Sequence, residues 1–441
     1  MNLRSLCPIL VAAISVFSWS QASNTVADQS ATSSNPRPVI SFQDALQRAK
    51  NNSAQFRAAL TEAGLAREDR VQARAALLPG VNYTTAAIYT EPTRESSPRF
   101  IAANGVREYI SQGNVHESFG FTTVADYRRA HAAEALAKAK AEIAARGLVL
   151  TVTQNYYGAI AAQRKRANAE QADDEAQRFL VLSRQLEKGG EVAHSDVIKA
   201  QLQANDRQRD LQEAKLAEEK AHLDLAVLVF PVYTEEFDLV DDLRFASPLP
   251  QFTEAQGLAA KNNIELKAAL AAVQVASNEF QAAVGGHLPT LTLDYFYGID
   301  APTYATRTDG VRNLGYQLSA TLQLPVFNWG ATQSKVRQAK LQRTQAQVEL
   351  SAAQRQALAD LRLFYSEASA AKEQIETLRQ SADLAAESLR LTNLRYKAGE
   401  ATALEVVDAQ NTLTVARDNF DDGEVRYRVA LANLQTLTGT F

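Results

Sequence analysis

The sequence is poor in sulfur-containing and indole side chains. Its 441 residues include one cysteine, one methionine and two tryptophans. The single cysteine, Cys7, lies within the first 22 residues, which we interpret below as a cleaved export signal. A chain without that segment has no thiol, which excludes disulfides, thiol catalysis and cysteine-ligated metals. After that segment no run of about 18 uninterrupted apolar residues occurs, so the sequence predicts no transmembrane helix.

Neither sign of charge dominates. The chain has 46 Lys and Arg residues and 50 Asp and Glu residues. Nucleic acid as the main partner would call for a basic surface, so we expect no nucleic-acid binding. The five histidines show no zinc-ligand spacing, and the sequence contains no GxSxG, P-loop or GxGxxG motif. We therefore expect no enzyme activity, no catalytic residues, no metal site and no cofactor.

The first 38 residues have the composition of an export signal followed by a tail. Arg4 supplies a positive charge, Leu6–Phe17 is too short an apolar stretch to anchor the chain in a bilayer, and Ser20-Gln21-Ala22 fits a cleavage site. We predict a signal peptide at 1–22 and a disordered tail at 23–38, which is rich in Ser, Ala, Asn and Pro. An exported chain without a transmembrane helix is either soluble or a membrane β-barrel.

The remaining sequence repeats itself after about 210 residues. The matches pair Phe42-Gln43-Asp44-Ala45 with Phe252-Thr253-Glu254-Ala255, Lys50-Asn51-Asn52 with Lys261-Asn262-Asn263, and Glu187-Lys188-Gly189-Gly190-Glu191 with Tyr396-Lys397-Ala398-Gly399-Glu400. Self-similarity at a fixed period indicates a duplicated structural unit. We predict one copy at 39–230 and a second at 252–441, joined by a proline-containing linker at 231–251.

Each copy contains two segments with strand-like alternation. In the second copy they lie at about 290–299 and 314–324, where apolar residues alternate with polar ones. The first copy has weaker counterparts at about 81–90 and 115–124. About ten alternating residues match a tilted transmembrane β-strand, although a soluble half-buried hairpin would show the same pattern. The polar stretches between the paired segments, at 91–114 and 300–313, fit the long external loops of an outer-membrane barrel.

Long helical patterns follow the strands. The segments 126–188 and 331–397 contain no proline, and at a rise of 1.5 Å per residue each spans about 95–100 Å. Each turns back into a shorter helix, which gives hairpins at 126–230 and 329–438. In the second hairpin the apolar residues alternate three and four apart as in a heptad seam, with Gly423 filling one seam position. The fold class is thus mainly α with a small β part.

Four strands cannot close a membrane barrel. Their edges would leave backbone groups unpaired in lipid, at a cost of several kcal/mol for each group. The chain must therefore associate with copies of itself if the strands cross a membrane. Two copies would give eight strands, a barrel that side chains fill, and three would give twelve, which can enclose water. The sequence thus predicts a tube with a membrane end and a helical end.

At three places the sequence resembles the TolC-like outer-membrane efflux protein family. These are the duplicated unit, Leu324-Pro325-Val326-Phe327-Asn328-Trp329-Gly330 at the strand-to-helix junction, and the segment from Tyr396 to Gln410 at the second hairpin turn. The resemblance implies a homotrimer in the outer membrane, with a twelve-stranded β-barrel in lipid and a helical tunnel in the periplasm. It also implies two partners, a periplasmic adaptor (membrane fusion) protein and an inner-membrane transporter of RND, ABC or MFS type.

The resemblance also assigns roles to single residues. The acidic positions of the periplasmic mouth fall on Glu405 and Asp408, which share a helix face because they are three residues apart. The resemblance assigns closure of the mouth to Tyr396 with Asp196 and Ser195. The family also has an arginine that links the helices at this end, but Ala401 stands at its position here. The resemblance implies that the adaptor or the pump docks at the hairpin turns, which comprise Gly189, Gly190, Glu191, Ala398, Gly399 and Glu400. Pro325, Phe327 and Trp329 at the strand-to-helix junction fit an interfacial aromatic girdle, or else an ordinary aromatic turn.

Three functions remain open from the sequence. The first is an efflux duct that carries small molecules or metal ions from an inner-membrane pump across the outer membrane. The second is the outer duct of a type I protein secretion system. The third is a structural periplasmic coiled-coil protein without a pore, which the strand alternation disfavours.

Overall fold

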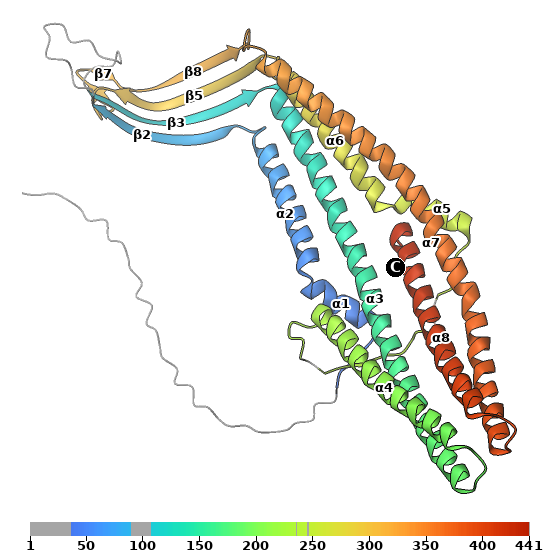
Figure 1. The fold of residues 1–441 in the computed structure, drawn as a ribbon. Coiled ribbons are helices and arrows are strands. Elements are labelled where there is room, and N and C mark those ends of the chain that lie inside the picture. The colour runs from blue at the N-terminus through green and yellow to red at the C-terminus, as the bar shows by residue number, and fades with distance from the viewer. Residues whose placement is uncertain (1–36, 90–106, 235, 245–246, 441) are drawn as a thin grey trace, which may run out of the picture.

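The computed structural model describes residues 37–89, 107–234, 236–244 and 247–440. It consists of a small antiparallel sheet and a long layer of helices that extends away from one end of the sheet (Figure 1). The predicted signal peptide at 1–22 and nearly all of the predicted tail at 23–38 lie outside the described residues. None of the helices in the described part of the chain is both long and apolar enough to cross a membrane.

The two halves of the chain contain the same elements in the same order. The first half contains α1 (Phe42–Asn52), α2 (Ala54–Ala75), β2 (Gly80–Tyr89), β3 (Arg107–Phe119), α3 (Phe121–Lys188) and α4 (His194–Val229). The second half contains α5 (Phe252–Asn262), α6 (Ile264–Gly285), β5 (Thr290–Ala301), β8 (Leu314–Gln323), α7 (Ala331–Lys397) and α8 (Ala403–Thr438). Two short pairs complete the structure: β1 (Val39–Ile40) with β4 (Asp238–Leu239), and β6 (Arg307–Thr308) with β7 (Val311–Arg312).

Two long helices run the length of the helical layer. With 68 and 67 residues, α3 and α7 each span about 100 Å. Near the sheet, α3 packs against α2 and α6, and α6 also packs against α7. Farther from the sheet, α3 packs against α4 and α8, and α8 packs against α7 (Figure 1). The layer therefore has α2 and α4 along one edge and α7 along the other.

Alanine, larger aliphatic residues and one glycine form the seam of the second hairpin. The predicted heptad seam between α7 and α8 is confirmed, because Ala368, Leu389, Val406 and Leu434 are all buried. A Cβ atom at Gly423 would lie 2.6 Å from Leu378 Cδ1. The glycine predicted at the seam thus lets the two helices approach closely at this point.

The sheet has the strand order β2-β3-β5-β8, and all neighbouring strands are antiparallel. The pairing places His116 on β3 opposite Asp294 on β5, and Asp294 opposite Ser319 on β8. Because successive side chains point to opposite faces, this register puts most polar residues on one face and the tyrosines and leucines on the other. Among the described elements, no helix covers the apolar face.

The second strand of the first half was predicted in the wrong place. We expected it at 115–124, followed by a helix from residue 126, but β3 spans Arg107–Phe119 and α3 begins at Phe121. The phenylalanines at 119 and 121 suggested continued alternation, yet Phe121 packs beside Gly285 at the end of α6. The residues 107–114 were assigned to a loop because they are polar, whereas pairing with β2 and β5 makes them strand.

Each half begins with two helices that meet at a capping residue. Ser53 ends α1 and caps α2. Asn263 ends α5 and caps α6. The structure therefore aligns Ser53 with Asn263, whereas the sequence repeat paired Asn52 with Asn263. Asn52 and Asn262 are then equivalent: their side chains donate to the carbonyls of Val229 and Thr438, at the ends of α4 and α8.

Candidate functional site

The two hairpin turns have the same backbone structure. They lie together at the end of the helical layer farthest from the sheet (Figure 1). Gly190 and Gly399 adopt φ angles of 78° and 76°, in the left-handed region. The Glu400 N–H donates to the Arg395 carbonyl at 2.9 Å, and a bond of the same kind and length closes the first turn. Both turns are therefore Schellman motifs, which glycine favours at this position.

These turns contain the residues that the sequence assigned to docking. The six residues are exposed and lie in one of the two turns: Gly189, Gly190, Glu191, Ala398, Gly399 and Glu400. The first turn also carries an ion pair, in which His194 Nδ1 lies 2.6 Å from Glu187 Oε1.

Glu405 helps to cap the N-terminus of α8. It forms a capping box, in which the Thr402 N–H donates to Glu405 Oε1 at 3.1 Å and the Glu405 N–H donates to the Thr402 hydroxyl. Arg395 Nη1 donates to the other carboxylate oxygen at 3.2 Å. The backbone and hydroxyl of Thr402, and then Arg395, lower the pKa of Glu405. This carboxylate is thus ionised but already bonded to its neighbours.

Asp408 differs from Glu405 although both are exposed on one face of α8. Within the described residues, the Asp408 carboxylate has no hydrogen bond and no ion pair. Its negative charge is therefore available to ions or partners at the turn.

Tyr396 is buried at the contact between the two hairpins, but its partner is not the predicted one. Its hydroxyl lies 3.1 Å from the hydroxyl of Ser183 on α3, and its ring centroid lies 5.0 Å from that of Phe179. Within the described residues of this single chain, no hydrogen bond joins Tyr396 to Asp196, with which the resemblance groups it. Asp196 instead lies 3.4 Å from Lys199, one turn along α4.

Ser183 was not among the residues predicted for closure. Ser195, which was, is exposed beside Asp196 at the start of α4. One signal could have indicated Ser183. Ser183 follows Ala176 by seven residues and Phe179 by four, so the three share one face of α3, and all three are buried. A serine on an otherwise apolar face needs a polar partner, and a buried tyrosine hydroxyl supplies one.

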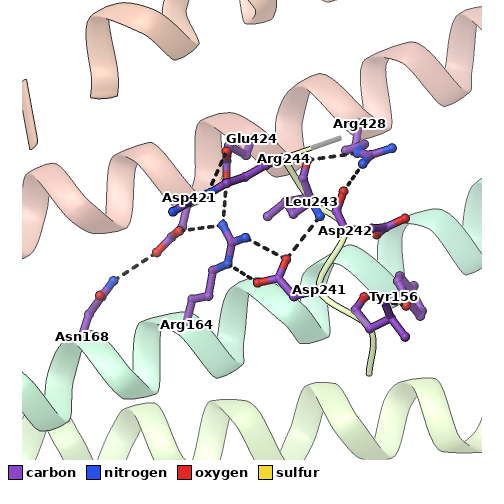
Figure 2. Close-up of polar contacts among 11 residues, drawn as sticks. Tyr156, Arg164, Asn168, Asp241, Asp242, Leu243, Arg244, Asp421, Glu424 and Arg428 are labelled. Carbon is purple, nitrogen blue, oxygen red and sulfur yellow. Dashed lines mark hydrogen bonds and ion pairs between the residues drawn. The ribbon is translucent and has the colours of Figure 1, made fainter. Parts of the chain in front are cut away.

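A charged cluster at mid-length was missed entirely. Arg164 on α3 donates from Nε and Nη2 to the two oxygens of Asp241, both at 2.7 Å, and from Nη1 to Glu424 at 2.5 Å and Asp421 at 3.2 Å on α8 (Figure 2). Burial would raise the pKa of Asp241, but the bond from Arg164, the Leu243 N–H and the charges of Arg164 and Arg244 together lower it. Burial raises the pKa of Asp421 despite the same arginine.

This cluster fastens the segment between the two halves of the chain onto the helices. Asp241 belongs to the predicted linker at 231–251, and the neighbouring backbone is bonded as well. Tyr156 on α3 donates to the Val240 carbonyl at 2.8 Å, and Arg428 on α8 donates to the carbonyls of Asp242 and Leu243 (Figure 2). Leu243 itself is buried. The linker thus joins α3 to α8 rather than only connecting two units.

The junction between β8 and α7 exposes two aromatic rings. Phe327 and Trp329 are exposed over 74% and 90% of their surface and meet edge to face at 5.0 Å between ring centroids. Trp329 has a φ of 56°, which is unusual for a bulky side chain. Pro325 ends the strand pattern just before them.

No group of three or more His, Cys, Asp or Glu residues in the described ranges is arranged to hold a metal ion. What the structure does present is an uncovered apolar sheet face at one end and paired helical turns at the other. A mainly helical chain of this form has the fold of an outer-membrane channel protein.

Comparison with known proteins identifies the family. The family described as outer membrane efflux protein matches residues 45–229 and again residues 256–440. The outer membrane protein TolC of Vibrio cholerae is 27% identical over 404 residues, which cover 89% of each chain. The proteases secretion protein PrtF of Dickeya chrysanthemi is 25% identical over 424 residues, covering 90% of this chain and 87% of PrtF. The chain belongs to the outer membrane efflux protein family.

The fold agrees with that membership. The crystal structure of the Campylobacter jejuni CmeC outer membrane channel superimposes with a TM-score of 0.79 at 16% identity, covering 90% of this chain and 85% of CmeC. The expected family and the outer-membrane location are confirmed. The protein is an outer-membrane duct of an efflux or secretion system, and a structural coiled-coil protein without a pore is set aside.

Proposed function

We propose that three copies of this chain close into one tube, with a twelve-stranded barrel in the outer membrane and a helical tunnel below it. The observation that carries the proposal is the sheet. Its edge strands β2 and β8 have no partner among the described strands of the chain, and its apolar face is exposed. In lipid, each unpaired backbone group on those edges would cost several kcal/mol.

The strand directions allow this closure. Because all four strands alternate in direction, β8 of one copy would run antiparallel to β2 of the next. Any number of copies would then give an even-numbered antiparallel barrel, as in bacterial outer-membrane proteins. Three copies give twelve strands, which leave room for water, whereas eight strands are filled by side chains.

The helical layer has matching edges. Exposed aliphatic residues lie along α4 at one edge, namely Ile198, Leu202, Leu216 and Leu223. Others lie along α7 at the opposite edge, namely Leu363, Leu384, Leu391 and Leu394. Contact between α4 of one copy and α7 of the next would bury both stripes. Such a head-to-tail interface generates a closed ring.

At the periplasmic end, the proposed mouth is lined by Asp408 and Glu405. Threefold symmetry would bring three copies of each carboxylate around one opening, which attracts cations and resists anions. Tyr396 would hold the second hairpin against the first through Ser183. This contact lies within one chain, and Ala401 offers no charge for a further link. Asp196 and Ser195 would then belong to the rim of the mouth rather than to its closure.

The remaining predicted sites fit the two ends of such a tube. Phe327 and Trp329 would lie at the interface of lipid and water, where amphipathic rings are enriched. The two turns would meet a periplasmic adaptor protein and an inner-membrane transporter of RND, ABC or MFS type. The matching halves support our proposal that the chain is a duplicated unit, with copies at 39–230 and 252–441 around the linker.

For the cargo we propose small molecules or metal ions, delivered by an inner-membrane pump. The second candidate is type I protein secretion, and the name of PrtF, a proteases secretion protein, favours it. Identification of the transporter that co-purifies with the protein separates the two.

The assembly is tested by the mass of the purified protein in detergent, measured by native mass spectrometry. Three copies are expected. Leu384→Glu, at the exposed edge of α7, should reduce the trimer because it places a charge in the proposed contact. Val415→Glu changes an exposed valine on α8 away from that edge and serves as the control. A monomer or dimer of the unaltered chain, or equal loss in both variants, would contradict the proposal.

A further inference from the structure

On the polar face of the sheet, the titratable side chains of the described strands are all acidic except one histidine. By the pairing register, it carries four titratable side chains in the described strands: Glu108 and His116 on β3, and Asp294 and Asp300 on β5. No lysine or arginine of these strands lies on this face, because Arg107 is opposite Tyr89 on the other one. In the proposed barrel this face lines the lumen. His116 is therefore the one group there that can gain a positive charge.

His116 is paired directly with a carboxylate. Its Nδ1 lies 2.7 Å from Asp294 Oδ1. On the other side of the imidazole, β2 places Gly80 opposite it, which has no side chain. The imidazole accordingly remains 49% exposed, whereas Asp294 is only 19% exposed. Protons from the lumen can thus reach the histidine, while the carboxylate it would neutralise is held in place.

No other charge competes at this level. The residues of β2 and β8 on the polar face are uncharged, and Glu117 lies on the opposite face of β3. The next acidic side chains on this face are Asp300, six residues along β5, and Glu108, eight residues along β3, which places them about 20 and 27 Å away at 3.4 Å per residue. His116 and Asp294 are therefore the nearest charges at this level of the described strands.

We propose that the His116–Asp294 pair is a proton-responsive selectivity element in the barrel lumen. With neutral histidines, three copies would present three carboxylates that favour cations. Histidine ordinarily changes its charge between about pH 5 and 8, and protonation would cancel each carboxylate. Acid outside the cell would thus reduce the cation preference of the duct. This inference rests on the proposed trimeric barrel.

The test measures ion selectivity in planar bilayers. The trimer is recorded in a gradient near 10 mM salt, where the screening length is about 30 Å, and acid is added only on the side of the external loops. We expect the cation-to-anion permeability ratio to fall about twofold between about pH 7.5 and 5.5. His116→Gln should keep the high ratio at both values. Asp294→Asn should begin from a lower ratio.

A second histidine provides the control. His194, whose Nδ1 lies 2.6 Å from Glu187 Oε1 in the first hairpin turn, is at the end of the tube opposite the acidified side, so His194→Gln should retain the response. A conducting trimer with an unchanged ratio, or with a response that persists in His116→Gln, overturns the inference and leaves the duct intact. A trimer that never conducts overturns the duct itself, and the inference with it.

Discussion

Two acidic residues of similar position have different chemistry at the second hairpin turn. Glu405 accepts bonds from Thr402 and Arg395, whereas Asp408 has no polar side-chain partner within the described residues. Sequence spacing alone treats them as equivalent because both lie on one helix face. In the proposed mouth, Asp408 should therefore bind a passing cation more strongly than Glu405.

That ranking predicts unequal effects on channel block. Asp408→Asn should weaken block by a trivalent cation more than Glu405→Gln, because the second variant removes a charge that Arg395 already offsets. The double variant should weaken block most. The inhibition constant is measured from single-channel recordings. Equal constants for both single variants would contradict the ranking, and unchanged block in the double variant would remove both residues from the mouth.

A half-buried acid on α8, Asp418, leads to a pH-dependent prediction. Burial raises the pKa of Asp418, and Asn168 only partly offsets this. A raised pKa means that the folded state holds the proton more tightly than the unfolded state, so this group destabilises the fold as pH rises above its pKa. Asp418→Asn should therefore stabilise at pH 7, by a few tenths of a kcal/mol because water screens a half-exposed group. The gain should vanish below about pH 4.

Thermal unfolding at the two pH values measures this difference. Glu62→Gln, at an exposed position on α2, is the matched control and should change stability little at either pH. If the stability gained by Asp418→Asn instead increased as the pH falls, the raised pKa of Asp418 would be contradicted.

At the scale of elements, one buried bond joins α3 to α7. Tyr396 and Ser183 are both fully buried, and their hydroxyls lie 3.1 Å apart. Tyr396→Phe and Ser183→Ala should each lower the free energy of unfolding by about 1 kcal/mol, since each leaves the other hydroxyl without a partner. The double variant should cost little more than either single one. Denaturant unfolding measures all three, and strictly additive losses would show that the hydroxyls do not interact.

The elements differ in how well sequence predicts them. The long helices and the α7–α8 seam follow from local periodicity, so they could be predicted. The start of β3 could not, because residues 107–114 are polar and become strand through pairing with distant segments. The contacts that Ser183 and the Arg164 cluster make could not be predicted either. Their partners lie 213 and up to 260 residues away, and no local pattern specifies such contacts.

The whole molecule shows a division between a fixed middle and two functional ends. The linker, Arg164 and Arg428 hold α3 and α8 together at mid-length (Figure 2). The exposed sheet and the two turns lie at opposite ends of the helical layer (Figure 1). A duct needs this arrangement, because its wall must stay intact while one end meets lipid and the other meets its partners.

Conductance tests the central claim most directly. The purified protein, reconstituted in a planar bilayer, should produce discrete conductance steps, because a closed ring of three chains encloses a continuous water path. Leu384→Glu, which places a charge in the proposed contact between copies, should abolish these steps, and Val415→Glu should retain them. The complete absence of conductance from the unaltered protein, at any voltage or pH, would contradict the account.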